Sequence, residues 1–97
     1  MNTESRMVKF ELWGVTSSKG VIDEKYLLKE IASSLSCGAR YASAKIEYDG
    51  KMAECTADEC NKVVYAFRHS KKNYQADLKE WANTRATKMM QEVGLII

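Results

Sequence analysis

The residues of this sequence best suited to chemistry are three cysteines and one histidine. Cys55 and Cys60 are separated by four residues, and His69 follows Cys60 after eight more. A zinc site built from these three with Cys37 as the fourth ligand lacks the short paired spacing of zinc modules. Cys55 falls on an apolar strand face and Cys60 on an apolar helix face, where thiols pack as small hydrophobic groups. We therefore expect free thiols, no metal ion and no other cofactor.

Catalysis by a general base or an activated nucleophile would depend on His69, the only histidine. Ser70 is its neighbour in sequence, but adjacency along the chain does not create the hydrogen-bonding geometry that such catalysis needs. The carboxylates are spread over charged faces and helix starts, without a pattern that opposes two acids across a cleft. The sequence therefore contains no catalytic constellation, and we expect a protein that is not an enzyme.

The segment from Gly14 to Gly20, GVTSSKG, joins an expected strand to an expected helix, as phosphate-binding loops do. A Walker motif needs Gly-Lys-Ser/Thr after its spacer, whereas Ser18, Lys19 and Gly20 occur in a different order. We interpret this segment as an ordinary connecting loop.

Positive charge gathers in the C-terminal third. The whole chain has 15 Lys and Arg against 13 Asp and Glu, a formal net charge of +2, far from the balance of a dedicated nucleic-acid-binding domain. Residues 61–97 hold seven basic and three acidic residues, net +4, and residues 1–60 hold eight and ten, net −2. Basic side chains beside Tyr74 would suit phosphates and a stacked base, although nearby acids dilute the field, so we expect only weak, non-specific nucleic-acid binding. The residues of this basic cluster are Arg68, His69, Lys71, Lys72 and Lys79.

Hydrophobic periodicity predicts the first two elements. Val8, Phe10 and Leu12 alternate with charged residues, which is typical of a strand with one buried face. A helix is expected from Ile22 or Asp23 onward, with Gly38 as its C-terminal cap.

A β-hairpin is expected next. Residues 41–48 alternate, and Asp49-Gly50 is the dipeptide best suited to a type I′ turn. With these two residues as the loop, Ile46 lies opposite Ala53, so that the apolar faces of both strands coincide.

Two further helices complete the prediction. Thr56 and Glu59 form a capping box that favours a helix over residues 60–68, although the alternation of apolar residues there also allows a strand. A polar break at 68–70 separates this segment from a last helix over about 71–93, which Gly94 ends. The fold class is therefore α+β, a single small domain over 1–97 with the order β-α-β-β-α-α, a three-stranded sheet packed against helices and a lead-in at 1–6.

The last helix carries a broad apolar stripe that suggests a partner or a homodimer. Its expected partner-binding residues are Tyr74, Trp81, Arg85, Met89 and Met90. Trp13 and Met52, on outward strand faces, support the same interpretation. We therefore expect a non-enzymatic protein-binding module, a small regulator or inhibitor of a larger complex, with nucleic-acid or phosphate binding by the basic cluster as the alternative. Without a secretory signal or a membrane span we expect the cytoplasm and no membrane partner, and an origin in a phage would fit the small size.

Overall fold

The computed structural model describes residues 7–20, 23–37, 42–70, 72 and 74–97. Its elements, in chain order, are β1 (Val8–Leu12), β2 (Val15–Lys19), α1 (Glu24–Ser36), β3 (Ala44–Tyr48), β4 (Lys51–Cys55), α2 (Ala57–Ser70) and α3 (Tyr74–Glu92).

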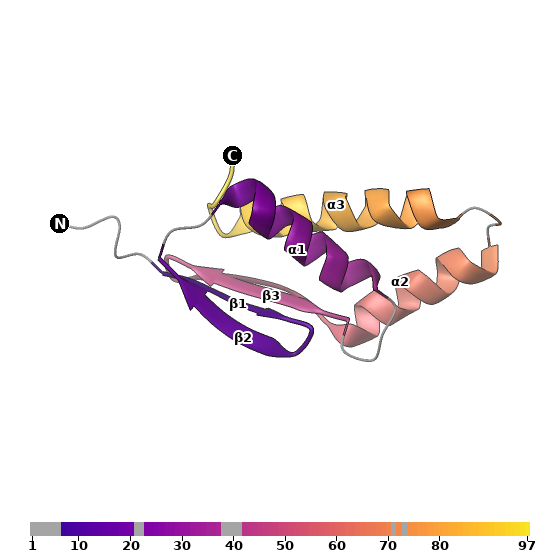
Figure 1. Ribbon diagram of the computed structural model, residues 1–97, viewed down its shortest axis with the longest axis horizontal. Coiled ribbons are helices and arrows are strands. Elements are labelled where there is room, and N and C mark those ends of the chain that lie inside the picture. The colour runs from indigo at the N-terminus through magenta and orange to yellow at the C-terminus, as the bar shows by residue number, and fades with distance from the viewer. Residues whose placement is uncertain (1–6, 21–22, 38–41, 71, 73) are drawn as a thin grey trace.

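The four strands form one antiparallel sheet in the order β2-β1-β3-β4. Helices α1 and α3 lie on the same side of this sheet, α1 against β1 and β3 and α3 against α1 and β4 (Figure 1). Helix α2 leads away from the sheet, and α3 returns beside it in the opposite direction (Figure 1). The α2–α3 hairpin gives the molecule its elongated shape, with extents of 53 × 24 × 18 Å.

The α+β class is confirmed, but the expectation of three strands was wrong. The segment interpreted as a loop contains β2, and the order is β-β-α-β-β-α-α. Trp13 and Gly14 both have positive φ, 53° and 79°, as the central residues of a type I′ turn do. Leu12 consequently pairs with Val15, and β2 continues antiparallel to β1. The sequence did not predict this strand because none of its residues is buried, so small polar side chains take the place of an alternating apolar pattern.

The hairpin at Asp49-Gly50 is confirmed in its predicted register. Ile46 is opposite Ala53, and the two turn residues have φ of 52° and 78°. The first of its strands begins at Ala44 rather than at Tyr41, which lies outside the described residues.

Each of the first two helices begins at a side chain that caps it. The Asp23 carboxylate accepts hydrogen bonds from the first-turn amides of α1, and Thr56 Oγ1 accepts one from the Glu59 amide at 3.2 Å. The segment 60–68 is helical, as the cap favoured. The break expected at 68–70 is wrong, because α2 runs through Ser70. Gly38, the expected cap of α1, lies outside the described residues.

Helix α3 ends as expected at Gly94. The Gly94 amide donates to the Gln91 carbonyl and the Leu95 amide to the Met90 carbonyl, which together form a Schellman motif around a residue with φ of 85°. This motif turns the C-terminal residues back, so that Leu95 and Ile96 pack against the core.

One cluster of buried side chains joins the sheet to the helices. Its members on the strands alternate along the chain, so all of them point to the helix-bearing face: Val8, Leu12, Ala44, Ile46, Ala53 and Cys55. The residues between them, which include Lys9, Glu11, Lys45 and Glu47, form a polar face on the other side of the sheet. Each large apolar side chain buried in this way contributes roughly 1.5–3 kcal/mol to folding.

Candidate protein-binding surface

Most of the apolar stripe of α3 is buried in the core of its own chain. Met89 and Met90, expected at a partner surface, are both 0% exposed and belong to the core. The stripe is wide because α3 packs against both α1 and the sheet. Tyr74 and Trp81 are half-buried, so little of the predicted partner surface on α3 is left exposed.

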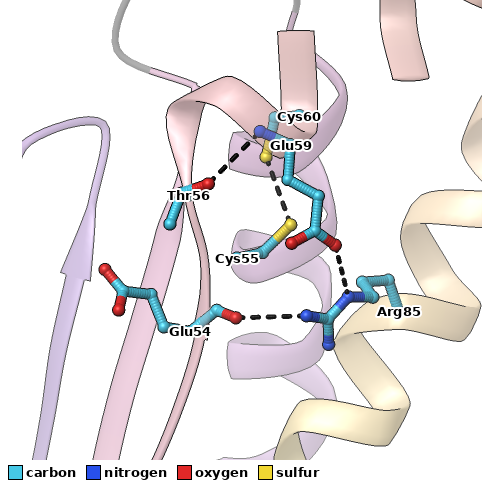
Figure 2. Close-up of polar contacts among 6 residues, drawn as sticks. All are labelled: Glu54, Cys55, Thr56, Glu59, Cys60 and Arg85. Carbon is cyan, nitrogen blue, oxygen red and sulfur yellow. Dashed lines mark hydrogen bonds and ion pairs between the residues drawn. The ribbon is translucent and has the colours of Figure 1, made fainter. Parts of the chain in front are cut away.

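Arg85, the remaining residue of the predicted partner surface, joins three elements of its own chain (Figure 2). Its Nε donates to Glu59 Oε2 at 3.3 Å, and its Nη2 donates to the Glu54 carbonyl at 3.1 Å. Glu59 therefore turns toward α3, whereas the predicted capping box requires its side chain to reach back to the Thr56 amide. Arg85 thus braces α3 against the end of β4 and the start of α2.

Cys55 and Cys60 meet beneath this brace (Figure 2). Their sulfur atoms are 3.4 Å apart, and both residues are fully buried. The hydrogen bond between the two thiols lowers the pKa of Cys55, while the same bond and burial raise the pKa of the Cys60 thiol. Cys37 is exposed. Within the described ranges, no three His, Cys, Asp or Glu side chains are placed to hold a metal ion.

The structure does not bring the residues of the basic cluster together at one site. Arg68 and Lys79 line one hollow of about 490 Å³ together with Tyr74. His69 instead stacks on Tyr65 within α2, with the ring centroids 4.0 Å apart. Lys72 is exposed, and Lys71 lies outside the described residues.

A groove that the sequence did not predict lies between β2 and α1. It has a volume of about 360 Å³, and its apolar lining includes Phe10, Trp13, Val15 and Tyr26. The exposed fractions of Trp13, Val15 and Tyr26 are 38%, 64% and 54%. The groove exists because α1 packs on β1 and β3, which leaves the helix-side face of β2 uncovered. Lys19 and Glu30 supply its charged lining.

The position of Trp13 is fixed by Ser34, the buried polar residue of α1. The Trp13 amide donates to Ser34 Oγ at 3.1 Å, and the Ser34 hydroxyl donates to the Ser43 carbonyl. Ser34 is 0% exposed, so water has little access to the hydroxyl that makes both bonds. One hydroxyl thereby ties the β1–β2 turn to α1 and to the chain entering β3.

The groove residues carried a faint signal in the sequence. Gly14 after Trp13 permits a two-residue turn, and Val15 and Thr16 are β-branched, as strand residues often are. A bulky residue with positive φ at the first turn position is unusual, however, so Trp13-Gly14 does not resemble a standard hairpin signal. Nothing in the sequence showed that α1 leaves β2 uncovered.

Comparisons with protein-family models, with curated proteins and with solved structures found no match to this chain. Among the helices that the structure describes, none has the length and apolar character needed to cross a membrane.

Proposed function

We propose that this chain is a non-enzymatic protein-binding module whose binding surface is the groove between β2 and α1. The observation that carries the proposal is the concentration of exposed apolar side chains there. Of the seven large hydrophobic residues that stay exposed in the described ranges, three line this groove: Trp13, Val15 and Tyr26. Aromatic residues are favoured at binding surfaces because they bury a large area at a small entropic cost.

The shape of the groove favours a partner segment in extended conformation. One wall is an edge strand, and strand addition supplies main-chain hydrogen bonds while alternate side chains of the segment enter the groove. A module of this kind acts by occupying a surface of its partner, as a small regulator or inhibitor does.

Site-specific photo-cross-linking in the native host tests the proposal. A photoreactive p-benzoylphenylalanine is placed at position 15 or 26 in the groove, or at position 65 as the control, since Tyr65 is 65% exposed on α2. We expect protein adducts from positions 15 and 26 and much less from position 65. Equal labelling at all three positions would contradict the proposal, and mass spectrometry of the adducts identifies the partner.

The hollow that holds Arg68, Tyr74 and Lys79 supports a second candidate function, weak binding of nucleic acid or another phosphate. Fluorescence anisotropy with single-stranded RNA at two salt concentrations tests it. Phosphate contacts release counterions, so affinity should fall steeply with salt, and Arg68→Glu with Lys79→Glu should abolish it. Tight binding at physiological salt that survives these changes would contradict this site.

A further inference from the structure

The open edge of β2 presents a defined set of main-chain groups. The Trp13-Gly14 turn is closed by the pair Leu12–Val15, which is hydrogen-bonded in a turn of this type. Hydrogen-bonded and non-hydrogen-bonded pairs alternate along an antiparallel ladder. The main-chain groups of Val15, Ser17 and Lys19 therefore face β1, and those of Thr16 and Ser18 point away from it. Since β2 is the terminal strand of the sheet, Thr16 and Ser18 form its open edge.

This edge carries little of the protection that edge strands normally have. Natural sheets block their edges with charges, proline or bulges. Strand β2 reads VTSSK, so its central residues are small and neutral and its single charge is at one end. The opposite edge differs, because β4 carries Lys51 and Glu54 and the Glu54 carbonyl already accepts a hydrogen bond from Arg85.

We propose that the partner bound at this surface is a second copy of the chain, which pairs antiparallel through β2 about a two-fold axis at Ser17. This inference rests on the proposed function, because it names the occupant of the same surface. The axis at Ser17 places Thr16 of each copy opposite Ser18 of the other, and both residues point their main-chain groups outward. Two hydrogen-bonded pairs, each with two bonds, then join the two four-stranded sheets into one.

The side chains are compatible with this register. Lys19 of one copy lies opposite Val15 of the other, so no like charges face each other. Lys19 and Trp13 both line the groove, and because Lys19 lies opposite Val15 of the other copy, this register brings its ammonium toward the end of the groove that holds the other copy's indole ring, which favours a cation–π contact. At the axis, the non-hydrogen-bonded Ser17 pair requires the closest approach of the two strands, and serine is small enough to allow it.

Side chains of the groove add to the surface area that the paired strands bury in the proposed dimer. A stable interface buries at least about 1,000 Å² in total. Pairing of the five residues of β2 with the same five residues of a second copy buries less than this. Trp13, Val15 and Tyr26 of both copies flank the paired strands and add their exposed surface. Interfaces at the lower end of the size range are typical of weak, reversible association, so we expect a dissociation constant on the order of micromolar.

Sedimentation velocity over a wide concentration range, with matched proline variants, tests the pairing. Thr16→Pro removes an outward N–H and leaves the ladder with β1 intact, so the variant should fold and remain monomeric. The control is Met52→Pro on β4, the strand at the opposite edge of the sheet. The pair Tyr48–Lys51 closes the β3–β4 hairpin, so by the same alternation the Met52 N–H points outward, away from β3. This control should dimerise like the unmodified chain, and circular dichroism of both variants reports that they are folded.

Cysteine trapping tests the axis itself. In a Cys37→Ser background, Ser17→Cys places two thiols at the axial pair, where Cα atoms about 4.5 Å apart allow a disulfide. With glutathione disulfide as oxidant, the two thiols form one disulfide and release two molecules of glutathione. Ser18→Cys is the control, because Ser18 lies opposite Thr16 of the other copy. We expect a covalent dimer from the first variant and not from the second.

The outcomes separate this inference from the proposed function. A chain that stays monomeric at every concentration, or a dimer that persists in Thr16→Pro, overturns the second-copy inference. If the photo-cross-linker at position 15 or 26 then captures a different protein, the proposed function stands with another occupant. If it captures nothing, both fail.

Discussion

Replacing Arg85 with methionine tests whether this residue is a structural brace or a free contact for a partner. Methionine keeps much of the aliphatic length and removes both donors, so the ion pair with Glu59 and the hydrogen bond to the Glu54 carbonyl are lost together. The matched control is Lys88→Met, an exposed lysine on the same helix.

The expected loss follows from the two contacts. The side chains of Arg85 and Glu59 are 21% and 47% exposed, so their ion pair is worth about 0.2–1 kcal/mol after solvent screening. The charge-assisted bond to the carbonyl adds about 1 kcal/mol in a partly exposed site. Arg85→Met should therefore lower the free energy of unfolding by about 1–2 kcal/mol. At roughly 4–8 °C per kcal/mol for a chain of this size, Tm should fall by roughly 4–16 °C.

Urea denaturation followed by circular dichroism measures this loss, and a double-mutant cycle with Glu59→Gln isolates the ion pair. The coupling energy should lie near 0.2–1 kcal/mol and shrink as salt is added. A loss no larger than that of Lys88→Met would refute the brace and return Arg85 to the candidate partner surface.

The remaining predictions concern the core, the turn and the thiols. Met90→Ala should cost about 2–5 kcal/mol in urea denaturation because the side chain is fully buried, and a loss below about 1 kcal/mol would place it at a surface instead. Ser34→Ala should cost about 1–3 kcal/mol, since it leaves the Trp13 amide of the β1–β2 turn without its partner, and unchanged stability would contradict that role. With Cys37 replaced by serine, glutathione disulfide should convert Cys55 and Cys60 to an intramolecular disulfide, seen as the loss of two hydrogens by mass spectrometry, because their sulfur atoms are 3.4 Å apart. Persistent thiols after long oxidation would show that burial prevents the reaction.

Local chemistry was sufficient to predict much of this fold. Asp49-Gly50 fixed a hairpin and its register, Thr56 selected helix over strand for residues 60–68, and Gly94 ended the last helix. In each case the determining interaction lies within a few residues, so neighbours in sequence are also neighbours in space.

The binding surface depended on contacts between distant segments. The stripe on α3 has the same sequence pattern whether a partner or the chain itself covers it, and only packing against α1 and the sheet buried Met90. The sequence alone is compatible with Arg85 as an exposed contact for a partner. The tertiary structure places Glu54 and Glu59 beside it, and these residues bind its guanidinium. The groove beside β2 exists because α1 packs against β1 and β3 and not over β2. Which strand stays uncovered depends on how the helix and the sheet pack as whole elements. Periodicity within one segment shows that a face is apolar, and only the tertiary structure shows what lies against it.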